Sequence, residues 1–169
     1  MRIELHTGDR EALRPLFELA EDSQAELDAY IGAGDVLVAI EGEELVGHLQ
    51  LVGDEIKNMA VVETHRGRGV GRALVAAAVE RARDERVAVL RVATGAADTG
   101  NLRFYQRQGF RLRAVQRDAF TPAAGYPPGL RLDGIELRDR VWLDRPLTPP
   151  GNGRPGRGDG VEPTVLPAV

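Results

Sequence analysis

Glycine and arginine alternate in one short segment of the sequence, Arg66-Gly67-Arg68-Gly69-Val70-Gly71-Arg72. Glycines between a strand and a helix allow backbone N–H groups to turn toward an anion, and the helix N-terminus adds the positive end of its dipole. The three arginines add formal positive charge. The pattern therefore predicts a site for a phosphate or pyrophosphate group. A second interpretation stays open, in which the glycines only allow a tight strand-to-helix turn.

The two common nucleotide-binding loops do not fit this segment. A P-loop ends in Gly-Lys followed by Ser or Thr, whereas Gly71 is followed by Arg72 and Ala73. A dinucleotide fingerprint that starts at Gly67 needs its third glycine at position 72, which is arginine. The loop is therefore expected to bind a different phosphate compound.

The elements that must position the loop alternate between strands and helices. Gly42 and Gly53 separate three apolar runs by short turns, which indicates an antiparallel meander. After the loop, apolar residues recur every fourth position from Val70 to Ala82, and a dense apolar run follows at 87–93. A strand, a helix and a strand in series predict a right-handed crossover with parallel pairing.

The sequence therefore predicts an α/β fold with one mixed central sheet, in which an antiparallel meander precedes a βαβ crossover and helices flank the sheet. Strands are expected at 2–6, 36–41, 44–52, 55–62, 87–93, 110–118 and 136–143. Helices are expected at 9–20 with a kink at Pro15, at 23–32 after the capping box Ser23-Gln24-Ala25-Glu26, from Val70 onward, and at 100–108.

Length and composition limit the class of protein. The 169 residues suit one domain, expected at 1–145, followed by a Pro/Gly-rich tail at 146–169. The net charge of −4 disfavours nucleic-acid binding, and the lack of cysteine excludes disulfides and a cysteine nucleophile. No apolar run is long enough for a membrane span and the polar start is unlike a signal peptide, so we expect no membrane association and a cytoplasmic protein.

Metal binding is not expected from the histidines of this sequence. His6, His48 and His65 fall on separate expected elements, and no pair of them has the spacing of a helical or hairpin metal site. We therefore predict that no metal takes part in the chemistry.

Two segments carry a family resemblance. The first runs from Met59-Ala60-Val61 to Leu74 and contains the spacing Arg/Gln-x-x-Gly-x-Gly/Ala at Arg66 to Gly71. The second is Asn101-Leu102-Arg103-Phe104-Tyr105-Gln106-Arg107-Gln108-Gly109-Phe110. Together, in this order and with one strand between them, they resemble the GNAT superfamily of acetyl-CoA-dependent N-acetyltransferases. The resemblance covers roughly residues 2–145.

The resemblance implies how acetyl-CoA binds. In GNAT proteins the fourth strand carries a bulge and separates from the fifth, so that the pantetheine arm pairs with the exposed backbone like an added strand. Carried onto this sequence, Met59-Ala60-Val61 contacts pantetheine and the acetyl carbonyl, and the loop from Arg66 to Arg72 holds the pyrophosphate. Asn101 and Tyr105 face the same cofactor. Homodimerisation is expected from the family alone.

Tyr105 is the candidate general acid. It lies one helical turn after Asn101, so both side chains project from the same face of their helix. A phenol of pKa about 10 is reasonably matched to a thiol of about 8.5, so a positioned tyrosine can protonate the departing CoA sulfur. The alternative is that Tyr105 is a half-buried aromatic residue that packs with Phe104.

Glu55 is the candidate general base. It begins the strand at 55–62, eleven residues before Arg66, and a glutamate near this offset is the base in histone-acetylating GNAT proteins, usually through water. A carboxylate need only accept a proton from an ammonium whose pKa is lowered by desolvation. The alternative is an exposed acid at a strand end beside Asp54.

The acceptor is expected to be a small-molecule or terminal primary amine. The first two helices flank the acceptor cleft in GNAT proteins, and acids there attract cations, although acidic runs are also typical of solvated surfaces. Here they carry Glu18, Glu21, Asp22, Glu26 and Asp28. The link at 120–137 is expected to cover the acceptor. A CoA-binding sensor without transferase activity is the alternative function.

Overall fold

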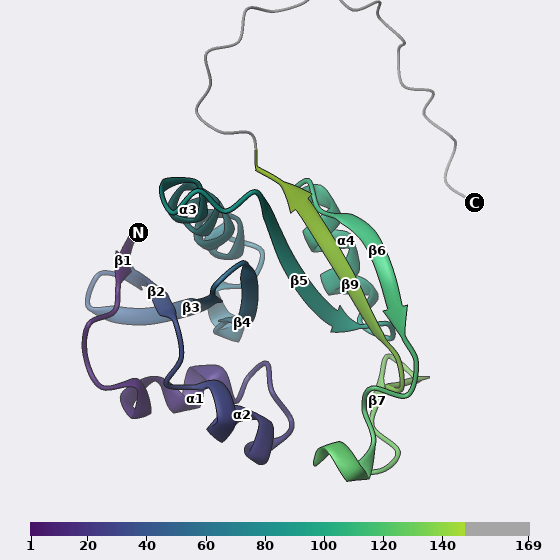
Figure 1. The fold of residues 1–169 in the computed structure, drawn as a ribbon. Coiled ribbons are helices and arrows are strands. Elements are labelled where there is room, and N and C mark those ends of the chain that lie inside the picture. The colour runs from purple at the N-terminus through teal and green to yellow at the C-terminus, as the bar shows by residue number, and fades with distance from the viewer. Residues whose placement is uncertain (148–169) are drawn as a thin grey trace, which may run out of the picture.

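The computed structural model describes residues 1–147, so the predicted tail lies almost entirely outside the described residues. A mixed seven-stranded sheet forms its centre, in the order β1-β2-β3-β4-β5-β9-β6 (Figure 1). Its strands are β1 (Arg2–Leu5), β2 (Asp35–Glu41), β3 (Glu44–Val52), β4 (Glu55–Val61), β5 (Val89–Gly95), β6 (Arg111–Gln116) and β9 (Arg140–Pro146). Only the β4–β5 pair is parallel. The predicted meander and crossover are confirmed.

Helices cover both faces of the sheet. They are α1 (Arg14–Phe17), α2 (Gln24–Tyr30), α3 (Val70–Asp84) and α4 (Thr99–Arg107). Because side chains alternate along a strand, Leu37 and Ala39 of β2 join the core under α3, whereas Val36 and Val38 join the core under α1 and α2. None of the helices within residues 1–147 is long and apolar enough to cross a membrane.

The first helix differs from its prediction. The continuous helix expected at 9–20 is wrong, because a 3₁₀ turn at Arg10–Leu13 precedes the short α1. Pro15 lies in the first turn of α1, where its missing N–H removes no intrahelical hydrogen bond. The chain therefore starts a new helix at this proline instead of kinking a longer one.

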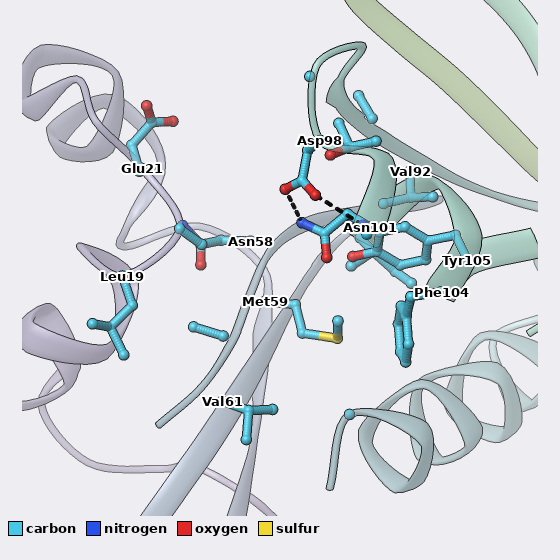
Figure 2. A pocket seen from close by; sticks show the side chains of 18 of the residues that line it. Leu19, Glu21, Asn58, Met59, Val61, Val92, Asp98, Asn101, Phe104 and Tyr105 are labelled. Carbon is cyan, nitrogen blue, oxygen red and sulfur yellow. Dashed lines mark hydrogen bonds between the residues drawn. The ribbon is translucent and has the colours of Figure 1, made fainter. Parts of the chain in front are cut away.

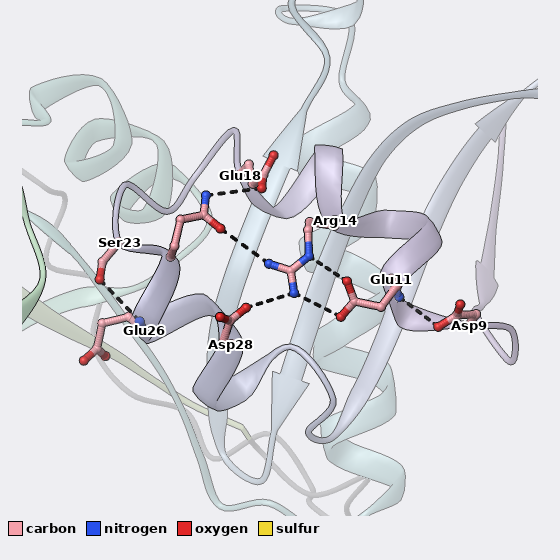
Figure 3. Close-up of polar contacts among 8 residues, drawn as sticks. Asp9, Glu11, Arg14, Glu18, Ser23, Glu26 and Asp28 are labelled. Carbon is pink, nitrogen blue, oxygen red and sulfur yellow. Dashed lines mark hydrogen bonds and ion pairs between the residues drawn. The ribbon is translucent and has the colours of Figure 1, made fainter.

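Polar contacts hold α1 against α2. The guanidinium of Arg14 lies 2.6 Å from Glu11 and 2.9 Å from Asp28 (Figure 3). The predicted capping box is confirmed at its first hydrogen bond, because the backbone N–H of Glu26 donates to Ser23 Oγ at 3.3 Å. This cap fixes the start of α2 and so the direction of the segment that joins the two helices.

The sheet opens between β4 and β5. The register of β3 against β4 shifts between Gln50 and Leu51, which leaves Lys57 as the extra residue of a β-bulge. The ladder between β4 and β5 includes only Glu55 and Ile56 of β4. Beyond the bulge, within the described residues, the backbone of β4 is therefore paired on the β3 side alone.

A buried hydrogen-bond chain ties the sheet to α1 and α2. His48 Nε2 donates to Asn58 Oδ1 at 2.9 Å, and Asn58 Nδ2 donates to the Tyr30 hydroxyl at 2.8 Å and to the Phe17 carbonyl at 3.2 Å. The accepting amide oxygen places the imidazole proton on Nε2. Burial lowers the pKa of His48 to about 4, so its ring is neutral near pH 7.

The last strand, β9, begins four residues and ends three residues later in the sequence than predicted, whereas β6 lies within its predicted bounds. The segment at 120–137 contains a 3₁₀ turn at Pro122–Ala124 and a small hairpin of β7 (Arg131–Leu132) and β8 (Ile135–Glu136). The hairpin includes Glu136, the first residue that was assigned to the last strand. Antiparallel pairing of β9 with both β5 and β6 then sets its register.

Candidate active site

A cavity of about 880 Å³ extends along the opening between β4 and β5. The segment between α1 and α2, strand β4, the glycine loop and α4 all contribute to its lining (Figure 2). It brings together almost all of the predicted site residues: Glu55, Met59, Ala60, Val61, Arg66, Gly67, Gly69, Val70, Gly71, Arg72, Asn101 and Tyr105. Arg68 lies outside the lining, and its guanidinium is 3.7 Å from the Glu41 carboxylate.

The glycines of the loop have two different structural roles. Gly67 and Gly69 have positive φ angles of +73° and +87°, and a Cβ atom at either position would meet nothing within 4 Å. Backbone conformation, rather than crowding, therefore requires glycine there, and the space beside both residues is open. At Gly71, in the first turn of α3, a Cβ would lie 3.3 Å from the ring of Phe104, so glycine allows α3 and α4 to approach closely.

Arg66 links the loop to the unpaired end of β4. Its Nε donates to the backbone oxygen of Val61 at 3.2 Å. The contact turns the guanidinium toward the cavity, where Arg72 also lies. Gly69 is the N-cap residue of α3 and has no side chain to cap the helix, so the N–H groups of the first turn have no side-chain acceptor there.

A carboxylate at the start of α4 orients Asn101. Asp98 accepts hydrogen bonds from the Asn101 backbone N–H at 2.8 Å and from Asn101 Nδ2 at 2.7 Å (Figure 2). With the amide nitrogen engaged, the oxygen of the Asn101 side chain is left as an acceptor. Sequence reasoning did not identify Asp98, although an acid three residues before an expected helical Asn is a recognisable N-cap signal.

Tyr105 follows one turn later on α4 and is almost completely buried. Its ring packs edge-on against Phe104 and Phe110, with centroids 5.1 and 5.7 Å away, yet the residue still lines the cavity. Burial raises the pKa of the Tyr105 phenol well above its usual value, and the negative charge of Asp98 raises it further. The phenol therefore stays protonated near pH 7, but the raised pKa makes it a weaker acid, less closely matched to a thiol than an ordinary tyrosine.

Glu55 lies at the first position of β4, where that strand still pairs with β5. Its side chain is 21% exposed and lines the cavity, and Oε1 is 3.6 Å from the ammonium of Lys57 at the bulge. The carboxylate can exchange protons with solvent and with a group inside the cavity. This position satisfies the first geometric requirement of a general base.

Two arginines of α4 were missed by the sequence reasoning. Arg103 and Arg107 are one helical turn apart, and both line the same cavity as the glycine loop. A basic pair at four-residue spacing was visible in the sequence, but nothing local indicates that this face of the helix turns toward the loop.

The two ends of the cavity carry opposite charge. Arg66, Arg72, Arg103 and Arg107 line one end and form no ion pair with another described residue. The acids Glu21, Asp22 and Glu26 line the other end, where Arg140 also lines the cavity, 5.2 Å from the centre of the Phe120 ring. The cavity thus suits a long anionic ligand whose far end meets a cationic group. No group of three or more His, Asp or Glu side chains within residues 1–147 is arranged to hold a metal ion.

Known proteins share this architecture. The "Uncharacterized N-acetyltransferase YvbK" of Bacillus subtilis (strain 168) is 33% identical over 151 residues, which cover 85% of this chain and 96% of the relative. The crystal structure of a Bacillus subtilis acetyltransferase in complex with CoA has a TM-score of 0.80 and 33% identity, with 87% of this chain and 99% of the other covered. A GNAT family acetyltransferase from Elizabethkingia anophelis with acetyl-CoA bound has a TM-score of 0.79 and 30% identity, with 86% and 97% covered.

A family model agrees with these similarities. The model described as "Acetyltransferase (GNAT) family" matches residues 5–110, which include β4, the glycine loop, α3 and α4. The match spans more than half of the chain, and the relatives above are covered almost from end to end. The chain belongs to the GNAT family of acetyltransferases.

Proposed function

We propose that this protein transfers an acetyl group from acetyl-CoA to a primary amine by direct attack of the amine. One observation carries the proposal: the unpaired backbone of β4 beyond Lys57 and the open glycine loop line the same cavity. A strand edge can pair with an amide-containing arm, and a loop at a helix N-terminus can bind a diphosphate. The CoA and acetyl-CoA complexes of the similar proteins support this use of the cavity.

The lining residues offer partners for the pantetheine arm and the diphosphate of acetyl-CoA. Backbone groups of Met59, Ala60 and Val61 would bind the pantetheine arm, and the loop from Arg66 to Arg72 would bind the diphosphate. Asn101 offers its side-chain oxygen to the same arm. When bound, acetyl-CoA supplies an acetyl thioester whose carbonyl carbon is the electrophile.

The side chains then divide the proton transfers of the reaction. Glu55 accepts a proton from the acceptor ammonium, directly or through water, so that a neutral nitrogen can form the new C–N bond. Backbone N–H groups of β4 stabilise the negative charge that develops on the carbonyl oxygen. Tyr105 donates its phenolic proton to sulfur as the C–S bond breaks, and the attacking nitrogen returns its second proton to the phenolate, directly or through water. The products are an N-acetylated amine, CoA and the proton that Glu55 then releases to solvent.

Transfer itself is the test that separates an enzyme from a CoA-binding sensor. The purified full chain is incubated with acetyl-CoA labelled in the acetyl group and a pool of primary amines, and mass spectrometry detects labelled amides. We expect acetylation of at least one amine. Saturable binding of acetyl-CoA without acetylation of any amine in a broad pool would overturn the transferase and favour the sensor.

Replacing both arginines of α4, Arg103→Gln with Arg107→Gln, is expected to weaken acetyl-CoA binding about 10-fold at low salt. The loss should shrink as salt is added, because the removed interactions are between exposed charges. Calorimetric titration at two ionic strengths measures both effects. The matched control is Arg111→Gln with Arg117→Gln, two exposed arginines in and just after β6 that lie outside the cavity lining, and an equal loss in the control would contradict a local role.

The Glu55→Gln variant is expected to lower kcat/KM about 10-fold near pH 7, with little change in acetyl-CoA affinity. Since the missing base matters only while the amine carries its proton, the deficit should fall as the pH rises toward the pKa of the acceptor. A pH–rate profile of the variant measures this. Glu44→Gln, at the start of β3 and outside the cavity, is the control. A variant profile that matches wild type in shape and amplitude would remove Glu55 as the base.

A further inference from the structure

The wall of the cavity that faces Tyr105 comes from the segment between α1 and α2. Figure 2 shows Glu21 and Leu19 on this wall, Asn101 and Tyr105 on the facing wall, and Met59 between them. A ligand that reaches from Tyr105 to Glu21 therefore passes apolar side chains first and ends at a carboxylate.

Neutral groups hold both oxygens of the Glu21 carboxylate. The backbone N–H of Ser23 donates to Oε1 at 3.0 Å, and the Tyr30 hydroxyl donates to Oε2 at 3.2 Å. Within residues 1–147 Glu21 has no ion pair, unlike Glu11 and Glu55. These two donors orient the carboxylate. Lys57 lies 5.1 Å from the centre of the Tyr30 ring and Arg140 lies 5.2 Å from the centre of the Phe120 ring, but neither forms an ion pair with Glu21.

The buried hydrogen bonds of Tyr30, Asn58 and His48 connect Glu21 to the sheet. Tyr30 is 8% exposed, and its oxygen accepts a hydrogen bond from Asn58, which in turn accepts one from His48. His48 thus donates a hydrogen bond to Asn58, Asn58 donates one to Tyr30, and Tyr30 donates one to Glu21. The Tyr30 hydroxyl can rotate little, because Asn58 fixes one side of it and Glu21 the other. Glu21 is therefore pre-oriented before any ligand binds.

The link at 120–137 closes this end of the cavity. Ser23 Oγ donates to the carbonyl of Ala124 at 3.4 Å, which docks the link on the start of α2. Tyr126 is buried and packs edge-on against Phe120 at 5.0 Å, and both line the cavity. The pKa of the Tyr126 phenol is raised first by burial and then by the charge of Glu21, while the charge of Arg140 lowers it.

We propose that Glu21 binds a second cationic group of the acceptor, so that the preferred substrates are primary amines joined by a short aliphatic chain to another ammonium group. This inference rests on the proposed acetyl transfer and adds the class of acceptor. The reacting nitrogen must lie neutral beside the thioester on β4, across the cavity from Glu21, so a separate charge has to satisfy the carboxylate. Aromatic rings beside a carboxylate are suited to an alkylammonium chain.

The test compares acceptors that differ only in the second charge. Each α,ω-diaminoalkane from three to six carbons is paired with the n-alkylamine of equal carbon number, and release of CoA is followed with a thiol reagent. For wild type we expect kcat/KM to be about 10-fold or more higher for the best diamine than for its monoamine. The product is confirmed by mass spectrometry as the mono-N-acetylated diamine.

Substitutions assign the preference to Glu21. Glu21→Gln is expected to raise KM for the diamine about 10-fold, with kcat largely kept and the monoamine unaffected. Tyr30→Phe removes only the hydroxyl that orients the carboxylate, and we expect a smaller rise in KM, about 3-fold, for the diamine alone. Glu18→Gln removes the same charge from the same segment outside the cavity and should behave as wild type.

The outcomes separate this inference from the proposed function. If wild type acetylates monoamines and diamines equally well, or if Glu21→Gln lowers both activities equally, then Glu21 has no role in acceptor choice. The proposed acetyltransferase activity is still supported in that case. If neither amine class is acetylated while acetyl-CoA binds, the transferase itself fails. Unchanged acetyl-CoA affinity and an unchanged melting temperature show that each variant is folded.

Discussion

The Tyr105→Phe variant is expected to lose activity by about 10²- to 10³-fold in kcat while its affinity for acetyl-CoA stays within about twofold of wild type. Among the described residues the Tyr105 hydroxyl has no hydrogen-bond partner, and phenylalanine keeps the packing against Phe104 and Phe110. Only the proton for the departing sulfur is removed. Steady-state kinetics and calorimetric titration of acetyl-CoA measure the two quantities separately.

The pH dependence gives a second readout for the same residue. Because burial raises the pKa of Tyr105, the phenol should remain protonated up to pH 10, and wild-type kcat should show no decline from loss of this acid below that pH. Thermal unfolding serves as the control for folding. A Tyr105→Phe enzyme with the turnover of wild type would remove the general-acid role and leave Tyr105 as a core residue.

Acidification from pH 7 to about pH 4 is expected to destabilise the protein by about 3 kcal/mol through His48 alone. An unfolded histidine has a pKa of about 6.5, whereas burial lowers the pKa of His48 to about 4. The unfolded chain therefore binds this proton first, and stability is lost as the pH falls from about 6.5 toward about 4. Above that window, His48 adds no pH dependence.

Urea unfolding at pH 7 and pH 4 measures this loss. Carboxylates also titrate there, so the comparison is with His48→Gln, whose amide can still donate to Asn58. We expect wild type to lose about 3 kcal/mol more than this variant over the interval. His6→Gln, which makes the same substitution at a partly exposed histidine outside the buried hydrogen-bond chain, is the matched control. Equal losses in wild type and His48→Gln would show that His48 is protonated without penalty.

Local patterns predicted the parts of the site that depend on neighbouring residues. The glycine loop follows from the spacing of its glycines, and the buried face of α3 follows from the apolar residues at every fourth position from Val70 to Ala82. Both are present in the structure. The cap of α2 follows from Ser23 and Glu26, three residues apart. In each case the interaction that fixes the structure spans only a few positions of the chain.

Contacts between distant residues explain what the sequence could not supply. The bulge at Lys57 depends on pairing with β3, and sequence reasoning had it only through the family resemblance. Asn58 contacts Tyr30 across 28 positions, so neither residue was identified as part of the site. The same holds for the α4 arginines, because the fold alone turns them toward the loop. The sequence could have predicted the break in the helix before Pro15, because proline is favoured in the first turn of a helix.

The charge distribution unites the two proposals. At one end of the cavity, four arginines without an ion pair among the described residues would match the phosphates of acetyl-CoA, and the oriented Glu21 at the other end would match a cationic acceptor. The thioester would then lie between them, beside Tyr105 and the open edge of β4. An overall net charge of −4 conceals this separation, which only the folded chain reveals.

Hydrogen–deuterium exchange with and without saturating acetyl-CoA tests the central claim most directly. If the arm of the ligand pairs with β4 and its diphosphate binds the glycine loop, exchange should slow in peptides that cover residues 57–62 and 66–72, and should stay unchanged in β1 at the edge of the sheet. Binding of acetyl-CoA that leaves both segments unprotected, or protects only segments outside the cavity, would contradict the account.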